Sequence, residues 1–129
     1  MNIMTKKGQV GPFSLFKSFR AAAAGLGQTL RTEQNMRFHL LATVIILACG
    51  WWVQLSPVEW SLIILCCVAV MGVELLNTAI EYLCDIVRDK MRLNYQATKI
   101  PRDMAAAAVL IVSMGAAAVG LIIFLPKFF

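Results

Sequence analysis

The stretch VEWSLIILCCVAVMGVELLNTAIEYLCDIV, residues 58–87, sets the fold class of this chain. It exceeds the about 17–25 apolar residues that a helix needs to cross a bilayer. The whole chain agrees, because 60% of its 129 residues are hydrophobic, 15% are charged and its mean hydropathy is +0.74. A soluble domain of this length could not bury so much apolar surface. We therefore predict an all-α membrane protein.

Two more apolar stretches and one amphipathic stretch complete a single predicted domain, residues 1–129. The predicted elements are an N-terminal surface helix at 13–31, transmembrane spans at 38–55, 58–87 and 103–125, and a polar loop at 88–102. The surface helix places Phe19 and Leu26 on one face and Arg20 on the other, as in helices that lie on a membrane. The third span is rich in alanine and glycine, which lets neighbouring helices approach closely.

The basic residues predict the orientation in the membrane. Eleven of the twelve precede the first span or lie between the second and third: Lys6, Lys7, Lys17, Arg20, Arg31, Arg37, Arg88, Lys90, Arg92, Lys99 and Arg102. Only Lys127 follows the third span. The positive-inside rule therefore places the N-terminus in the cytoplasm and the C-terminus outside. This topology explains the net charge of +5, so no nucleic-acid partner is expected.

The second half of span 58–87 carries polar side chains at helical spacing. On a helical wheel, one face holds Glu74, Asn77, Thr78, Glu81 and Asp85. Acidic side chains are costly inside a bilayer and rarely face lipid. We therefore expect this face to line a protein interior or a hydrated cleft near the cytoplasmic side.

Charged residues beside the other spans complete a set that is typical of phosphoryl transfer. They are Glu33 before the first span and Lys99, Arg102 and Asp103 at the start of the third. Carboxylates bind Mg²⁺, basic groups bind phosphate oxygens, and a further carboxylate can accept a hydroxyl proton. Together these are the parts of a phosphoryl-transfer site, although the chain has no P-loop motif.

Three sequence blocks resemble the small bacterial membrane kinases, the diacylglycerol kinase and undecaprenol kinase family. They are TEQNMRFH at 32–39, ELLNTAIEYLCD at 74–85 and RDMAAAAVL at 102–110. The resemblance covers about residues 13–125. It implies a homotrimer in the bacterial inner (cytoplasmic) membrane, with three membrane helices and a surface helix per subunit. It also implies ATP as co-substrate and Mg²⁺ as cofactor.

The resemblance also assigns roles by position. It implies Glu74 as the catalytic base, and Glu33 and Glu81 as the ligands that hold Mg²⁺ on the nucleotide phosphates. The implied nucleotide-binding residues are Lys17, Asn77, Glu81, Asp85, Lys99, Arg102 and Asp103. Asp85 is expected near the nucleotide's sugar. Arg102 stands where the family has lysine, so Arg102 and Lys99 are both candidates for the phosphate contact, and contacts in loop 88–98 stay open.

The acceptor is predicted to be a membrane lipid hydroxyl, with undecaprenol favoured over diacylglycerol. The spacing of Glu33, Arg37 and His39 and the ending GLIIFLPK at 120–127 look more like the undecaprenol kinase branch. His39 is expected to be an interfacial hydrogen bonder rather than a catalytic group. The alternative from another class is a non-enzymatic, ion-coupled membrane protein, because intramembrane glutamates also serve ion coupling. We expect the outer halves of all three spans to carry no charge, which argues against that alternative.

Overall fold

The computed structural model describes residues 12–129, and this part of the chain is helical with no strand. Its elements are α1 (Pro12–Thr32), α2 (Gln34–Trp52), α3 (Pro57–Met91), the 3₁₀ helix η1 (Tyr95–Thr98) and α4 (Lys99–Phe128). The all-α prediction is therefore confirmed for these residues. Lys6 and Lys7, which contribute to the predicted orientation, lie outside the described residues.

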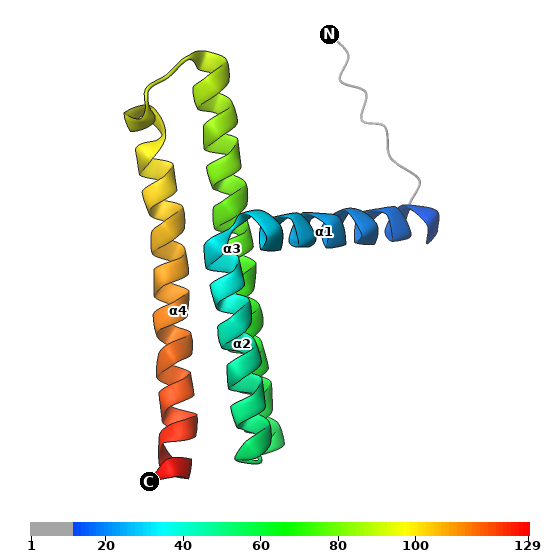
Figure 1. Cartoon of the computed structure of the whole chain (residues 1–129), viewed down its shortest axis with the longest axis vertical. Helices are drawn as coiled ribbons and strands as arrows, with labels where there is room; N and C mark the ends of the chain where they lie inside the picture. Colours follow the sequence, from blue (N-terminus) through cyan, green and yellow to red (C-terminus); the bar gives the residue numbers. More distant parts are fainter. Residues whose placement is uncertain (1–11) are drawn as a thin grey trace.

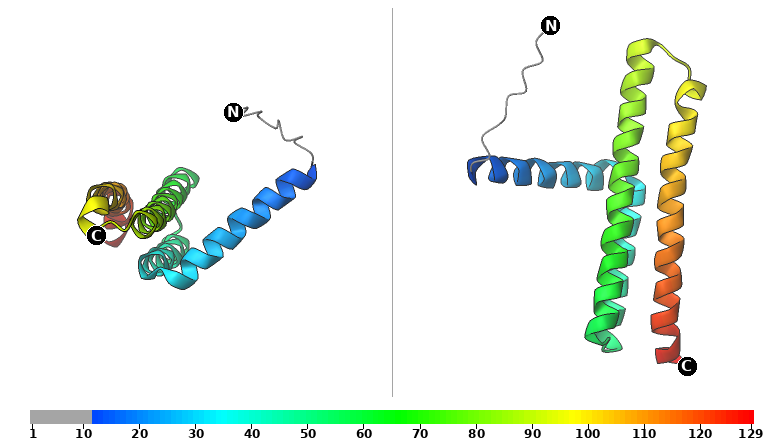
Figure 2. Two further views of the ribbon diagram at one scale, coloured as in Figure 1. Left: turned by 90° about the horizontal axis from the view of Figure 1, so that it is seen from above. Right: turned by 180° about the vertical axis from the view of Figure 1, so that it is seen from behind.

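Three of the helices lie side by side, and α1 meets them at its end and points away from them, crosswise to their long axes (Figure 1). α3 and α4 form a long antiparallel hairpin, and α2 packs against α3 (Figure 2). The change of direction between α1 and α2 occurs at one residue, Glu33, whose backbone is extended with φ −100° and ψ 120°. The first predicted metal ligand therefore occupies the corner where the crossing helix meets the bundle.

The amphipathic helix α1 covers the predicted surface helix at 13–31 and keeps its apolar face exposed. Leu15, Phe16 and Phe19 are between 64% and 75% exposed. Only the end of α1 meets the other helices (Figure 1). An apolar face without a protein partner suits a helix whose apolar side enters the boundary of a membrane.

α3 and the segment Tyr95–Phe128, which contains α4, are long and apolar enough to cross a membrane. Only 22% and 6% of their most apolar 18-residue windows are buried, whereas the core helix of a soluble protein would be mostly covered. α2 falls short of the same test for a spanning helix. Its first turns contain Arg37 and His39, which shorten its apolar run. The third span stays a prediction.

A tight turn joins α2 to α3 at the end of the bundle that carries the C-terminus (Figure 1). Ser56 and Glu59 form a reciprocal capping box, and Pro57 occupies the first turn of α3. Glu59 also pairs with Lys127 at 3.1 Å. The expectation that the outer halves carry no charge is therefore wrong, because this pair joins α3 to the end of α4.

The segment between α3 and α4 is shorter than the predicted polar loop at 88–102. α3 continues to Met91 and ends where Arg92 takes the left-handed conformation, with φ 51° and ψ 41°. α4 already begins at Lys99, and η1 fills most of the gap. Arg88 and Lys90 extend α3 because their charge favours the carboxyl end of a helix. The polar composition of 88–102 therefore reflects solvated helix ends more than a loop.

The unequal helix lengths place the acidic residues relative to α1. At 1.5 Å per residue, α2 measures about 28 Å and α3 about 52 Å. α2 ends and α3 begins at the same tight turn, and the two helices run in opposite directions from it. The first residue of α2 therefore lies level with about residue 75 of α3. Glu74 thus lies at the level of α1, while Glu81 and Asp85 lie beyond it. The far end of the α3–α4 hairpin projects past α1 (Figure 1).

Candidate functional site

Glu74 lies at the centre of a polar cluster where α3 passes the corner between α1 and α2. Its side chain is almost fully buried, with 2% of the residue exposed. It interacts with Asn35 and His39 of α2, with Glu81 of α3 and with Glu33 at the corner. Glu74 therefore feels the charges of both predicted metal ligands, although Glu33 lies far from the other two in sequence.

Asn77 orients Glu81 one helical turn beyond Glu74. The Asn77 amide donates a hydrogen bond from Nδ2 to Oε1 of Glu81 at 3.0 Å. The other amide atom, Oδ1, is buried and has no partner among the described residues. A buried oxygen without a donor or cation nearby is unfavourable, so Asn77 Oδ1 is suited to a ligand that supplies positive charge or a hydrogen.

Glu33 is tied to α3 through two hydroxyl groups. Thr32 donates from Oγ1 to Oε1 of Glu33 at 3.2 Å. The Tyr82 hydroxyl in turn donates to Oγ1 of Thr32 at 3.4 Å. The corner is thereby held to α3 at Tyr82. Sequence reasoning missed Tyr82. Because it directly follows Glu81, helical periodicity does not group it with the acidic residues of α3.

The donors in this cluster fit Mg²⁺ carried on nucleotide phosphates better than a resident metal ion. Within residues 12–129, no three His, Cys, Asp or Glu side chains are grouped closely enough to hold a metal. Glu33, Glu81 and Asn77 Oδ1 are all hard oxygen donors. Mg²⁺ is usually held by one or two carboxylates, with phosphate and water oxygens completing its shell. The residues present meet that requirement.

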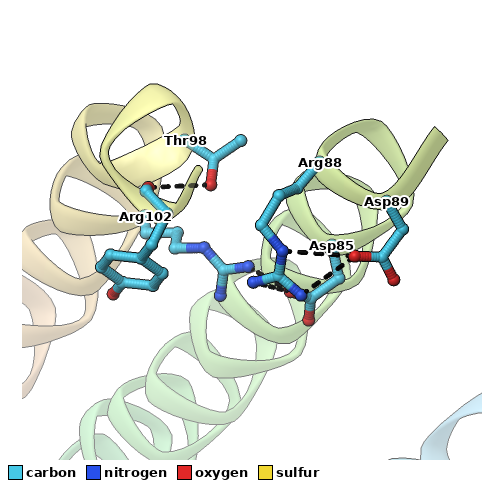
Figure 3. A network of polar contacts seen from close by, with 6 residues as sticks. Asp85, Arg88, Asp89, Thr98 and Arg102 are labelled. Carbon is cyan, nitrogen blue, oxygen red and sulfur yellow. Dashed lines mark hydrogen bonds and ion pairs between the residues drawn. The ribbon is translucent and has the colours of Figure 1, made fainter. Parts of the chain in front are cut away.

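A second cluster joins the projecting ends of α3 and α4 (Figure 3). Arg102 donates from Nη2 to Oδ1 of Asp85, and Arg88 contacts the same oxygen through Nη1 at 2.9 Å. The Arg102 guanidinium also lies over the ring of Tyr95, 5.4 Å from its centroid. Arg88 additionally pairs with Asp89 at 3.2 Å. Asp85 and Arg102 together therefore join α3, α4 and η1 at one point.

This cluster separates two candidates for the phosphate contact. The Arg102 side chain is 14% exposed and engaged by Asp85, whereas Lys99 is 52% exposed. Lys99 makes an i,i+4 pair with Asp103, itself 63% exposed, at 3.5 Å. Solvated pairs of this kind are weak and open readily to another anion. The structure thus places Asp85 and Arg102 against each other and leaves Lys99 and Asp103 accessible.

Lys17 lies apart from these clusters in the single chain. It is on α1, about 24 Å along the helix from Glu33 at 1.5 Å per residue. Its predicted contact with the nucleotide stays a prediction.

Two residues of α2 that act on Glu74 were not predicted as site residues. Sequence reasoning had left His39 without a catalytic role and had not noticed Asn35. Their i,i+4 spacing on α2, two and six residues after Glu33, is the signal that could have found them.

The comparisons with known proteins cover nearly all of the described chain. A family model described as prokaryotic diacylglycerol kinase matches residues 20–124, from the middle of α1 to near the end of α4. The match includes both clusters. Lys17 falls just outside it.

Three curated relatives show similarity over most of the chain. An undecaprenol kinase from Bacillus subtilis (strain 168) is 43% identical over 112 residues, which cover 87% of this chain and 89% of the relative. A diacylglycerol kinase from Synechocystis sp. is 34% identical over 92% of this chain and 66% of the relative. A diacylglycerol kinase from Pseudomonas aeruginosa is 30% identical over 79% of this chain and 80% of the relative.

Proposed function

The chain belongs to the prokaryotic diacylglycerol kinase family and is a lipid kinase, as its sequence blocks predict, and we propose that its acceptor is undecaprenol. ATP and undecaprenol then give undecaprenyl phosphate and ADP. The observation that best supports this acceptor is the 43% identity, over 87% of this chain, to the protein named undecaprenol kinase. The ion-coupled, non-enzymatic alternative is wrong, because the family consists of kinases.

Diacylglycerol is the second candidate acceptor. Two relatives named diacylglycerol kinase are 34% and 30% identical to this chain. Both acceptors present one hydroxyl on a membrane lipid, so the same phosphoryl-transfer chemistry serves either. Relative kcat/KM values for the two lipids in mixed micelles decide between them. A preference for diacylglycerol would reverse the proposed acceptor while leaving the lipid kinase activity in place.

Glu74 is the proposed catalytic base. The residue is 2% exposed at the level of α1, where the charges of His39, Glu81 and Glu33 act on it. It takes the proton of the lipid hydroxyl as the hydroxyl oxygen attacks the γ-phosphorus of ATP in line with the departing ADP oxygen. A lipid whose tail lies in the membrane reaches this level without leaving the bilayer.

Glu33 and Glu81 are the proposed ligands for Mg²⁺, with Asn77 beside them. These carboxylates would hold the ion on the nucleotide, and it would supply positive charge that offsets the negative charge developing during transfer. Asn77 holds the Glu81 carboxylate at 3.0 Å, so this ligand is oriented before nucleotide arrives, while the Thr32 hydroxyl can donate either to Glu33 or to the Gln28 carbonyl, both at 3.2 Å. Preorganised ligands of this kind reduce the cost of reorganisation during the reaction.

For the nucleotide, we propose that Lys99 rather than Arg102 contacts the phosphates, and that Asp103 positions Lys99. Lys99 is half-exposed and its pairing distance of 3.5 Å is long. Asp85 and Arg102 serve mainly to fix α4 against α3, in place of the direct nucleotide contacts implied by the resemblance. Lys17 is retained as a proposed nucleotide contact, supplied from α1.

The assembly and placement in the membrane are also proposed. We propose a homotrimer in the bacterial inner membrane, with three spans per subunit, a cytoplasmic N-terminus and an external C-terminus. The distribution of basic residues supports this orientation, because Lys127 alone follows the third span. The mass of the protein in detergent, and labelling of single introduced cysteines from either side of a vesicle, test the two proposals separately.

Glu74→Gln tests the mechanism directly. The amide cannot accept the proton but keeps the size of the side chain, so turnover should fall by about 10²–10⁴-fold while nucleotide binding persists. Glu59→Gln on the same helix is the matched control, because Glu59 lies at the opposite end of α3. Turnover within about threefold of the parent in Glu74→Gln would contradict the assignment of the base.

Glu33→Gln and Glu81→Gln test the metal ligands. Each should raise the Mg²⁺ concentration needed for half-maximal activity by at least about tenfold, since loss of one anionic ligand weakens the site. The control is again Glu59→Gln, whose Mg²⁺ dependence should match that of the parent. Unchanged Mg²⁺ dependence in both variants would rule out this pair as the ligands.

A further inference from the structure

An apolar groove runs along the membrane part of the bundle, directly below the Glu74 cluster. It lies between α2, α3 and α4 and encloses about 490 Å³. α2 and α4 both pack on α3, but their backbones do not come into contact with each other among the described residues. The groove therefore opens sideways between α2 and α4, toward the space that lipid occupies.

The walls of the groove are apolar and made largely of small residues on α4. Ala116, Ala117 and Gly120 line that side, and a Cβ added at Gly120 would meet nothing within 4 Å. At the end of the bundle near the α2–α3 turn, a buried cluster of Leu55, Ile63 and Ile123 closes the space. The groove is thus closed at this end, open along its side, and suited to a hydrocarbon chain.

The other end of the groove lies close to the proposed base, about one helical turn of α3 short of it. His39 lines the groove and also interacts with Glu74, and Val70 lines it one helical turn before Glu74. A chain bound in the groove would therefore place its head group beside the Glu74 carboxylate.

Ser113 supplies a second polar group at this end. The pair Asp85–Arg102 fixes the antiparallel alignment of α3 and α4. Glu74 lies eleven residues before Asp85, and Ser113 lies eleven residues after Arg102, so the two are at the same level. The pair Glu59–Lys127 at the other end of the two helices leads to the same alignment of Glu74 with Ser113, to within one residue. Ser113 lines the groove, and its Oγ is buried without a hydrogen-bond partner among the described residues.

From this arrangement, and resting on the proposed undecaprenol kinase function, we infer that the α2–α3–α4 groove binds the first isoprene units of a polyprenol. Ser113 and His39 hold its terminal hydroxyl against Glu74. The hydroxyl gives Ser113 Oγ the partner that it lacks in the free chain. His39 then acts as a positioning residue for both the hydroxyl and the Glu74 carboxylate.

The chemistry of the groove favours a single prenyl chain over a diacylglycerol. A polyprenol is apolar up to the carbon that carries its hydroxyl, whereas a diacylglycerol has two ester groups and two chains next to its hydroxyl. Polar groups in the wall are limited to His39, Thr43 and Ser113 together with two thiols. Thr43 already interacts with the thiol of Cys67. Few hydrogen-bond donors therefore remain for the ester carbonyls of a diacylglycerol. The groove also has room for one chain rather than two.

The test uses the full-length protein in vesicles of phosphatidylcholine and phosphatidylglycerol, with polyprenols of increasing length as acceptors. Gly120→Leu fills the groove, and Gly115→Leu is the matched control on α4, because Gly115 also has open space around it but does not line the groove. We expect Gly120→Leu to lower kcat/KM for undecaprenol at least tenfold, with a much smaller loss for a five-carbon prenol. Gly115→Leu should resemble the parent, and KM for ATP should be unchanged throughout.

Ser113→Ala tests the head of the groove separately. Removing one hydrogen bond to the acceptor should raise KM for undecaprenol about tenfold without changing KM for ATP or the folded fraction. His39→Ala should reduce kcat for undecaprenol without changing KM for ATP or the folded fraction, because the group that positions the hydroxyl is lost. A purely structural role for His39 would instead lower the folded fraction and leave kcat of the folded protein unchanged.

The possible results separate this inference from the proposed function. If the parent protein phosphorylates no polyprenol of any length, the proposed function fails. If the parent is active on undecaprenol but Gly120→Leu and Gly115→Leu behave alike, the groove does not hold the tail. If Gly120→Leu changes the oligomeric state rather than the length dependence, the groove receives a second copy of the chain, and the inference is overturned.

Discussion

Arg102→Met removes the strongest tie between the projecting ends of α3 and α4. The Arg102 side chain is 14% exposed, donates to Asp85 and lies over the Tyr95 ring. A hydrogen bond to a charged partner contributes about 1.5–3 kcal/mol, and a guanidinium over an aromatic ring about 0.5–1 kcal/mol. Asp85 is 43% exposed and keeps Arg88 at 2.9 Å, which reduces the loss. We expect a net destabilisation of about 2 kcal/mol.

A double-mutant cycle isolates this pair. Arg102→Met, Asp85→Asn and the double variant are unfolded in mixed micelles by increasing SDS, followed by tryptophan fluorescence. The coupling free energy should be about 1–2 kcal/mol, within the range of directly bonded side chains. The matched pair Lys99–Asp103, at 3.5 Å and more than half exposed, should couple by about 0.5 kcal/mol or less. If Asp85–Arg102 coupling is no larger than that of the control pair, the tie contributes nothing to stability.

Three further predictions follow from other parts of the structure. Lys99→Met should raise KM for ATP about tenfold with little change in stability, because a single contact between a cation and phosphate is worth about 1.4 kcal/mol or more. An unchanged KM for ATP would mean that another residue contacts the phosphates. Gly50→Ala should destabilise the protein by about 1–3 kcal/mol, since the added Cβ would lie 2.9 Å from Cδ1 of Leu55. Gly72→Ala, with nothing within 4 Å, should be tolerated in the same SDS titration. Ser56→Ala removes the capping box of α3 and should cost about 1 kcal/mol; a loss under about 0.3 kcal/mol would mean that Pro57 alone determines the start of α3.

The helical arrangement of this chain could be predicted because its signals are periodic. Hydropathy and amphipathic spacing predicted α1 and the long apolar helices, and the wheel placed Glu74, Asn77 and Glu81 on one face. Their grouping with Glu33 could not be derived from the wheel, since it depends on the turn at the corner between α1 and α2. The family blocks supplied that expectation, and in the structure the charge of Glu33 acts on Glu74.

The parts that sequence reasoning missed depend on contacts between helices. The wheel placed Asp85 with the other carboxylates, but α4 brings Arg102 to it and so uses it as a tie between helices. Glu59 escaped notice because a single acid near the start of an apolar helix has no periodic signal; its pairing with Lys127 needs the alignment of α3 with α4. The same alignment is needed to see that Ser113 lies at the level of Glu74.

The most direct test is a competition assay in which the purified protein transfers labelled phosphate from ATP to undecaprenol and diacylglycerol in the same mixed micelles. The parent should label undecaprenol with the higher kcat/KM, and Glu74→Gln should label neither lipid while still binding ATP with Mg²⁺. Labelling of neither lipid by the folded parent protein, or full labelling by Glu74→Gln, would contradict a lipid kinase that uses Glu74 as its base.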